Sequence, residues 1–213
     1  MKVEYATFPE RESRSKYISE YYANVLKTSI LDVGCDNQHI RKFLPEDISY
    51  TGIDISGTPT VKINLEKVDK LPFDDNAFDT VICTDVLEHL DNLHHIFAEL
   101  VRVSKKHLII SLPNNWNNAR KPIKIGKGSF AHFGLPAERP IDRHKWFFNI
   151  TEAQDFLTAQ CISHNLKEEE QHVTDKPRPF FTRALRRLKE CSQERYINRY
   201  ANTLWTLLSK KDD

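Results

Sequence analysis

The chain has 213 residues, of which 39% are hydrophobic and 29% are charged, and its formal net charge is +1. This length suggests one domain with a substantial core, and the composition excludes a disordered, collagen-like or fibrous chain. No apolar run approaches the roughly 20 residues that cross a bilayer, and the N-terminus lacks the apolar core of a signal peptide, so a cytoplasmic protein is expected.

The first half of the chain predicts helices that alternate with apolar strands. Residues 11–27 carry an approximate 3.6-residue apolar stripe and predict a helix. Strands are predicted at SILDVG, YTGIDI, VKINL, FDTVICT and HLIISLP, a helix begins at HIRKFL, and a long amphipathic helix is predicted over residues 85–103. Strands that are apolar on both faces and separated by helices indicate a parallel sheet covered on both sides.

The second half begins with a break in this alternation. Residues 114–148 carry prolines and glycines without a sustained period, and they follow the fifth strand, at the edge where doubly wound sheets bind ligands. A helix with Thr151 as its N-cap, a sixth strand within residues 161–173, a helix over residues 179–192 and a closing strand over residues 202–210 follow.

Together these elements predict a doubly wound α/β domain with a mostly parallel, seven-stranded sheet, helices on both faces and an irregular insertion after the fifth strand. The single domain covers residues 1–213. Its parts are an N-terminal helical segment (1–28), a core that binds a cofactor (29–113), an insertion that covers an acceptor site (114–148) and C-terminal helices with closing strands (149–213).

A ribose site is indicated where the first two strands end. Gly34 follows the first strand and leaves room for close approach, and Asp54 ends the second strand, where a carboxylate can accept both hydroxyls of a ribose. A dinucleotide-binding turn requires G-x-G-x-x-G, but this turn has a single glycine, and Asp36 would repel a diphosphate. A cofactor without phosphate that carries a positive centre and an amino-acid tail tolerates these acids, and S-adenosylmethionine fits that description.

Four segments resemble successive motifs of the class I S-adenosylmethionine-dependent methyltransferases. They are ILDVGC, YTGIDIS, LPFDDNAFDTVICTDVLEHL and ELVRVSKKHLIISLPN, which span roughly residues 29–114, and the LPF…FD…LEH pattern resembles the branch that acts on small molecules. The resemblance implies a Rossmann-like fold and a set of cofactor-binding residues. These are Asp32, Gly34 and Cys35 at the methionine end, Asp54 and Ile55 at the ribose and adenine, Asn64 and Leu65 at the adenine edge, and Thr84 and Asp85 beside the sulfonium.

The glycine positions mark a departure from that family. Asp36 and Gln38 stand where the family usually has glycine. Either the turn shifts slightly and still binds the cofactor, or its affinity falls. A binding module that keeps the fold without turnover is therefore one alternative.

The methyl acceptor is expected beside the irregular segment HFGLPAERPIDRHKWFF. Methyl transfer needs an aligned nucleophile and, for a hydroxyl, a group that removes its proton, and the candidates are His132, Asp142 and His144. Trp146 and Phe133 are expected to form an acceptor-binding wall. The residues expected to pair with an anionic group are Arg139, Arg143 and Lys145. Because RHKW loosely resembles methyltransferases encoded among bacterial surface-polysaccharide genes, we expect O-methylation of a small molecule, sugar, sugar nucleotide or lipid-linked glycan.

Nucleic acid is not the expected partner. SLPNN after the fifth strand does not match the N/D-P-P-Y/F motif of amino-methylating nucleic-acid enzymes, which follows the fourth strand. Basic residues nevertheless gather within residues 120–127 and 176–211. A solvated face is the simplest interpretation, and an RNA-modifying enzyme that uses this basic C-terminal half stays an alternative.

No metal site is expected from the sequence. The four cysteines are far apart with no CxxC pair, and Cys35 and Cys83, which lie in apolar runs, are interpreted as buried thiols of a reducing compartment. Asp85 and Glu88 form a D-x-x-E pattern that predicts a capping box, and His89 is expected on the helix surface or in packing.

Overall fold

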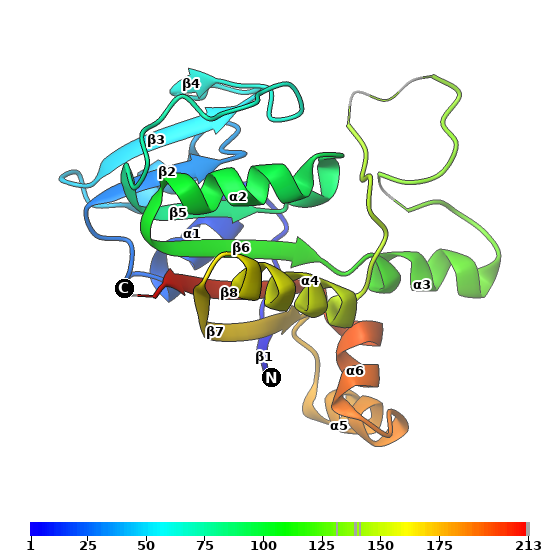
Figure 1. The fold of residues 1–213 in the computed structure, drawn as a ribbon. Helices are drawn as coiled ribbons and strands as arrows, with labels where there is room; N and C mark the ends of the chain where they lie inside the picture. Colours follow the sequence, from blue (N-terminus) through cyan, green and yellow to red (C-terminus); the bar gives the residue numbers. More distant parts are fainter. Residues whose placement is uncertain (131, 139, 141, 212–213) are drawn as a thin grey trace.

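The fold is built on one mixed sheet. The computed structural model describes residues 1–130, 132–138, 140 and 142–211. The strands lie in the order β1-β7-β8-β6-β5-β2-β3-β4 (Figure 1). They are β1 (Lys2–Tyr5), β2 (Ser29–Val33), β3 (Ser49–Asp54), β4 (Val61–Lys62), β5 (Phe78–Thr84), β6 (Ser104–Pro113), β7 (Leu166–Asp175) and β8 (Thr203–Lys210). Only β8 runs antiparallel to its neighbours, β6 and β7, so the predicted mostly parallel α/β sheet is confirmed.

The predicted count of seven strands is wrong, because the described part of the chain forms eight. The additional strand is β1, which pairs in parallel with β7 from Lys2 opposite His172 to Tyr5 opposite Asp175. Its four residues, KVEY, alternate polar and apolar side chains, but so short a run does not by itself predict a strand. Pairing with the edge strand β7 completes this strand.

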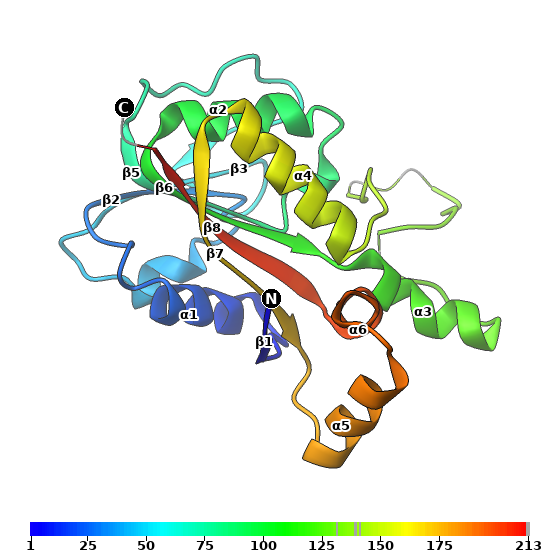
Figure 2. The same ribbon diagram turned by 60° about the horizontal axis from the view of Figure 1, so that its bottom comes forward.

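The helices cover both faces of the sheet. They are α1 (Arg11–Tyr21), η1 (His39–Phe43), η2 (Leu87–His89), α2 (Leu93–Val103), α3 (Asn115–Ile125), α4 (Ile150–Ser163), α5 (Phe180–Lys189) and α6 (Gln193–Tyr200). Figure 2 shows α2 and α4 on one side of the sheet and α1 on the other. In the described residues, no helix has both the length and the apolar character needed to cross a membrane.

Successive residues of the central strands enter two separate cores. In β5, Val81 and Cys83 pack with the α2 and α4 side, whereas Ile82 packs with the α1 side. In β6, Leu108 likewise packs with the α2 and α4 side, and Ile109 packs with the α1 side. This two-sided burial explains why these strands are apolar without interruption. Cys35 and Cys83 are buried free thiols, as the sequence predicts, and Cys161 and Cys191 are free thiols as well.

The single helix predicted over residues 85–103 is wrong. The chain forms the short η2, becomes extended at Leu90 (φ −104°, ψ 127°) and starts α2 only at Leu93. The break is held by tertiary contacts, because the indole Nε1 of Trp146 donates to the Leu90 carbonyl at 2.8 Å and Asn92 Nδ2 donates to the Leu65 carbonyl at 3.0 Å. The predicted Asp85–Glu88 capping box does not form.

The segment after β6 is more regular than its prolines and glycines indicate. Its first part is α3, which contains Pro122 and ends at Gly126 in the left-handed conformation. The predicted N-cap Thr151 is wrong, because Asn149 caps α4 and forms a capping box with Glu152. The prediction also missed α6, whose residues Tyr196, Ile197 and Tyr200 are buried.

Asn114 joins the carboxyl end of β6 to α6. Its side chain is fully buried, and its amide donates to the carbonyl oxygens of Ile197 (3.2 Å), Asn198 (2.9 Å) and Ala201 (2.8 Å). We expect Asn114→Ala to lower the free energy of unfolding by about 1–3 kcal/mol, because buried carbonyls lose their donor. Urea unfolding measures this. Asn118→Ala, at an exposed position of α3, is the control, and equal effects of the two variants would contradict the role of Asn114.

Candidate cofactor and acceptor site

The turn after β2 keeps a glycine-like path although it lacks two of the usual glycines. Asp36 (φ 48°) and Gln38 (φ 55°) both adopt the left-handed conformation. The turn is fastened to the segment after β3, since Gln38 Nε2 donates to the Thr58 carbonyl and Thr58 N donates to the Asp36 carbonyl at 2.9 Å. Gly57 makes this contact possible, because a Cβ there would lie 2.4 Å from the Asp36 oxygen. The substitutions therefore leave the turn in the shape that glycines would give it.

Asp54 holds this turn from the end of β3. Its Oδ2 accepts the Asp36 N–H at 2.8 Å, and its Oδ1 accepts the Ser56 N–H at 2.9 Å. Each carboxylate oxygen offers more than one acceptor direction, so the group can bind a ribose hydroxyl as well. Ile55 beside it is 55% exposed, which suits a residue that flanks an adenine ring.

The other residues predicted at the adenine and methionine ends lie around the same edge. Asn64 Oδ1 caps its own turn by accepting the Glu66 N–H at 3.0 Å, and Leu65 is buried. Gly34 (φ 77°) makes room for Val86, because a Cβ there would lie 2.2 Å from Val86 Cγ2. Its role in admitting the cofactor by close approach stays a prediction.

A small cavity lies between α1 and the ends of β2 and β5. Among its lining residues are Asp32, Gly34, Cys35, Asp36 and Thr84, together with two arginines that sequence reasoning missed, Arg11 and Arg14. Arg14 forms an ion pair with Asp85, and Arg11 Nη1 lies 2.8 Å from Asp36 Oδ2. The sequence of α1 does not indicate that these two arginines line a cavity, because charged residues on the exposed face of an amphipathic helix are usual.

The charges of this edge fit S-adenosylmethionine better than a nucleotide. Four carboxylates, Asp32, Asp36, Asp54 and Asp85, surround the turn and favour a cofactor with a cationic sulfonium and an ammonium group. The arginines offer a partner for its carboxylate. The cavity has a volume of about 30 Å³, and both arginines line it.

Burial changes the acidity of two groups in this cavity. It raises the pKa of Asp32 to about 6, although Tyr50 donates a hydrogen bond of 2.7 Å to this carboxylate. It also raises the pKa of the Cys35 thiol to about 12, so that this cysteine stays protonated at neutral pH and is not a nucleophile.

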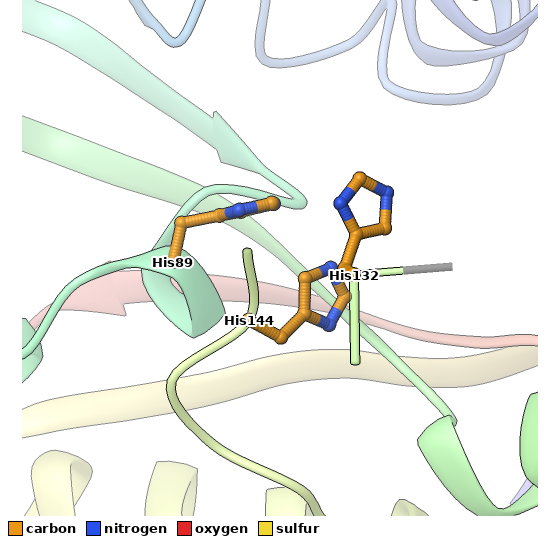
Figure 3. Close-up of side chains that lie close together, drawn as sticks. All are labelled: His89, His132 and His144. Atoms are coloured by element: carbon orange, nitrogen blue, oxygen red, sulfur yellow. The ribbon is translucent and has the colours of Figure 1, made fainter. Parts of the chain in front are cut away.

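The acceptor candidates His132, Asp142 and His144 do come together, beside η2. The rings of His132 and His144 are stacked, with centroids 4.6 Å apart, and Asp142 Oδ2 lies 3.6 Å from His132 Nδ1. Sequence reasoning missed the role of η2, which adds His89 and Glu88 to this group. Figure 3 shows the His89 ring beside those of His132 and His144. Burial and the neighbouring histidines lower the pKa of His144 to about 4.

An apolar cavity of about 280 Å³ lies next to this group. Its lining includes Glu88, His94, Trp146, Phe147 and Phe156. Trp146 thus lines a cavity as the predicted acceptor wall would, whereas the Phe133 ring packs against His144 at 5.1 Å between centroids. The expected anion partner Lys145 is engaged by Asp91 (2.9 Å) and Glu66 (3.4 Å), and Arg139 lies outside the described residues.

Residues 31–110 match the family model described as a methyltransferase domain. The matched segment is shorter than half of the chain and runs from β2 into β6. The match supports an enzyme of the S-adenosylmethionine-dependent methyltransferase class, with S-adenosylmethionine as its cofactor.

Solved structures share the fold of this methyltransferase chain at low sequence identity. An S-adenosylmethionine-dependent methyltransferase from Archaeoglobus fulgidus has a TM-score of 0.61 at 16% identity, over 96% of this chain and 96% of that chain. The small RNA methyltransferase HEN1 has a TM-score of 0.63 at 17% identity, over 100% of this chain but 27% of that chain. Magnesium protoporphyrin IX methyltransferase from Synechocystis, with bound SAH, has a TM-score of 0.53 at 15% identity, over 95% and 83% of the two chains. No curated protein matches the sequence.

Asp54→Ala is expected to weaken the binding of S-adenosylhomocysteine by about tenfold or more, because it removes a charged hydrogen-bond acceptor. Isothermal titration calorimetry measures the change. Asp47→Ala, at an exposed position before β3, is the matched control and should bind as the parent protein does. Unchanged affinity in Asp54→Ala would place the ribose elsewhere.

The buried carboxyl of Asp32 predicts a pH-dependent stability. Its folded pKa of about 6 exceeds the ordinary 3.8, so between these values the folded chain holds a proton that the unfolded chain has released. Its contribution to stability therefore falls as the pH rises from about 4 to 6. Relative to the parent protein, Asp32→Asn should gain about 1–3 kcal/mol over this interval. Urea unfolding at pH 4.5 and pH 7 tests this, and a pH-independent difference would contradict it.

Proposed function

We propose that this chain transfers a methyl group from S-adenosylmethionine to a hydroxyl oxygen of a small organic or glycan acceptor. One observation carries the proposal. Three polar residues that can accept or donate a proton, His132, Asp142 and His144, lie together next to an apolar cavity. The polar group and the cavity both lie beside η2, which follows the end of β5 at Thr84, where the cofactor's sulfonium is expected. This arrangement supports an acceptor pocket and a proton path beyond the expected position of the sulfonium.

S-adenosylmethionine supplies a methyl group on a positively charged sulfur, which is already a good leaving group. The new bond forms between the acceptor oxygen and the methyl carbon while the carbon–sulfur bond breaks, and its electron pair stays on sulfur. The chain's part is to hold the ribose at Asp54, to pair the cofactor's carboxylate with Arg14, and to align the acceptor. The acceptor proton leaves through the histidine group toward Asp142, whose side chain is 57% exposed.

The apolar cavity supports an acceptor with a hydrophobic or ring-shaped part. Its volume of about 280 Å³ is near the lower end of the roughly 300–1,000 Å³ typical of small-molecule sites. Aromatic side chains such as Trp146 and Phe156 line it, and flat aromatic faces pack against sugar or other rings. A glycan or another small hydroxyl compound therefore fits this site.

Trp146→Ala is expected to raise KM for the acceptor several-fold while leaving the affinity for S-adenosylhomocysteine unchanged, because the indole lines the cavity and not the cofactor edge. Methyl transfer is followed by mass spectrometry of acceptors that carry free hydroxyls. Trp116→Ala removes an indole on α3 that is 48% exposed and serves as the control. Equal KM values in all three proteins would rule out this pocket for the acceptor.

The same assay separates the proposal from a binding module without turnover. An enzyme consumes S-adenosylmethionine and releases S-adenosylhomocysteine when an acceptor is present. Binding of both ligands with no methylated product across sugars, sugar nucleotides and small hydroxyl compounds would favour the module.

RNA is a second candidate acceptor, and one comparison favours it, because the small RNA methyltransferase HEN1 shares the fold over the whole of this chain. The basic C-terminal half supports it less, since Arg183, Arg186 and Arg187 stack on tyrosine rings at 4.2, 4.3 and 4.8 Å. A salt series tests this candidate. RNA affinity should fall steeply as salt rises, and absent or salt-insensitive binding would exclude RNA.

A further inference from the structure

Three histidines from distant parts of the chain converge on one point. His89 belongs to η2, and His132 and His144 belong to the segment between α3 and α4. One ring nitrogen from each lies within 4.8 Å of the others. The His89 and His144 rings meet edge to face with centroids 4.5 Å apart, and those of His89 and His132 with centroids 5.4 Å apart (Figure 3). Such convergence is unexpected for residues that serve only as surface or packing groups.

A buried carboxylate faces the same point. The Glu88 side chain is 1% exposed, and neither of its oxygens has a hydrogen-bond partner. Its Oε1 lies 3.8 Å from His89 Nε2 and 4.0 Å from His144 Nε2. Donor atoms in a tetrahedral metal site with bonds of 2.0–2.2 Å are separated by roughly 3.3–3.5 Å. The two carboxylate–imidazole distances exceed this separation by about half an ångström, and the distances between the imidazole nitrogens, which are at most 4.8 Å, exceed it by up to about 1.5 Å. Side-chain rotations that bring these atoms together would turn them into metal ligands.

Two of the histidines have a carboxylate near the ring nitrogen that would not bind the metal, as metal-binding imidazoles usually do. Asp142 Oδ1 lies 2.6 Å from His89 Nδ1, and its Oδ2 lies 3.6 Å from His132 Nδ1. A carboxylate on one ring nitrogen leaves the other nitrogen available and makes it more basic. His144 differs, because its Nδ1 lies 3.1 Å from the Asn115 amide nitrogen. Ligation through its Nε2 requires this amide to turn over, so that its oxygen accepts the ring proton.

We infer that His89, His132, His144 and Glu88 form a binding site for one divalent metal ion of the Zn²⁺ or Mn²⁺ type. Three imidazoles and one carboxylate favour first-row transition metals over Mg²⁺ and Ca²⁺, which prefer oxygen ligands. No cysteine takes part, which is why the search for cysteine spacing in the sequence predicted no metal. The ligands come from an EH pair in η2 and from a segment without regular structure.

The position of this site suggests what the ion does, a step that depends on the proposed methyl transfer. The site follows Asp85, the residue expected beside the sulfonium, by only three residues in the chain. A metal-bound hydroxyl has a lowered pKa and loses its proton more easily. With the ion bound, the histidines would serve as its ligands and would no longer carry the proton. The acceptor oxygen would then attack the methyl carbon, while its proton passes directly toward Asp142 and solvent.

The first experiment measures metal binding alone. The metal-free protein is titrated with Zn²⁺ by calorimetry and with Mn²⁺ by electron paramagnetic resonance, and one ion per chain is expected. His89→Ala should lower the affinity by about 100-fold or more through loss of a ligand and of its ordered neighbours. His95→Ala, at an exposed position of α2, is the control and should bind as the parent protein does. Absent binding, or the same affinity in the parent and His89→Ala proteins, would overturn the site.

Glu88→Gln separates ligation from a structural role. The substitution keeps the shape of the side chain and removes a buried acid that has no hydrogen-bond partner. We expect the melting temperature of the metal-free protein to be unchanged or higher, and the metal affinity to fall at least tenfold. A lower melting temperature with full metal affinity would show that Glu88 is a structural residue and would overturn its assignment as a ligand.

Binding of S-adenosylhomocysteine to the metal-free protein tests the proposed function independently of the metal. Full cofactor binding, with methyl transfer that a chelator abolishes and Mn²⁺ or Zn²⁺ restores, supports both proposals. Chelator-insensitive methyl transfer would overturn the catalytic role of the ion. Metal binding in a protein that does not bind the cofactor would overturn the proposed function and leave the metal site supported.

Discussion

The shape of the expected cofactor site depends on the carboxylate of Asp54. This group links the end of β3 to the turn after β2, because its Oδ2 accepts the Asp36 N–H at 2.8 Å. Without this link, Asp36 and Gln38 would have little reason to remain left-handed, a conformation that costs a residue with a Cβ about 1–2 kcal/mol. Gly57 contributes by letting the two segments touch. The side chain expected to hold the cofactor's ribose is therefore also the one that shapes the loop around it, so loop geometry and cofactor binding are coupled through one group.

The sequence predicts the central sheet well because each central strand buries both faces, which leaves an uninterrupted apolar run. The two main errors have a common cause. Leu87, Leu90 and Leu93 continue a helical spacing, but the chain between them is pulled into η2 and an extended residue by contacts from distant segments. Likewise β1 exists because β7 offers it an edge. Tertiary contacts decided both elements: the helical spacing continues through the break after η2, and the alternation in KVEY is too short to predict β1.

The candidate site is less predictable than the fold. The order of motifs indicates which strand ends face a cofactor, because parallel strands end at a common edge. The individual cofactor contacts remain predictions. The D-x-x-E pattern was assigned to helix capping, but Asp85 pairs with Arg14 and Ser111 while Glu88 has no hydrogen-bond partner. The same D-x-x-E pattern is compatible with a helix cap and with a metal ligand at Glu88. Only the position of His144 in the folded chain, which the sequence does not reveal, distinguishes the two roles.

The two halves of the site differ in how their negative charge is balanced. On the cofactor half, Asp85 is paired with Arg14, so the chain itself supplies a cation that an incoming sulfonium can replace. On the acceptor half, Glu88 makes no ion pair with a lysine or arginine in the described residues, and its Oε1 lies within 4.0 Å of ring nitrogens of His89 and His144. A buried carboxylate without a cation is unfavourable, and either a proton or a metal ion relieves it. The chain therefore balances the cofactor half with its own arginine, whereas the acceptor half is balanced by a proton or by the proposed metal ion.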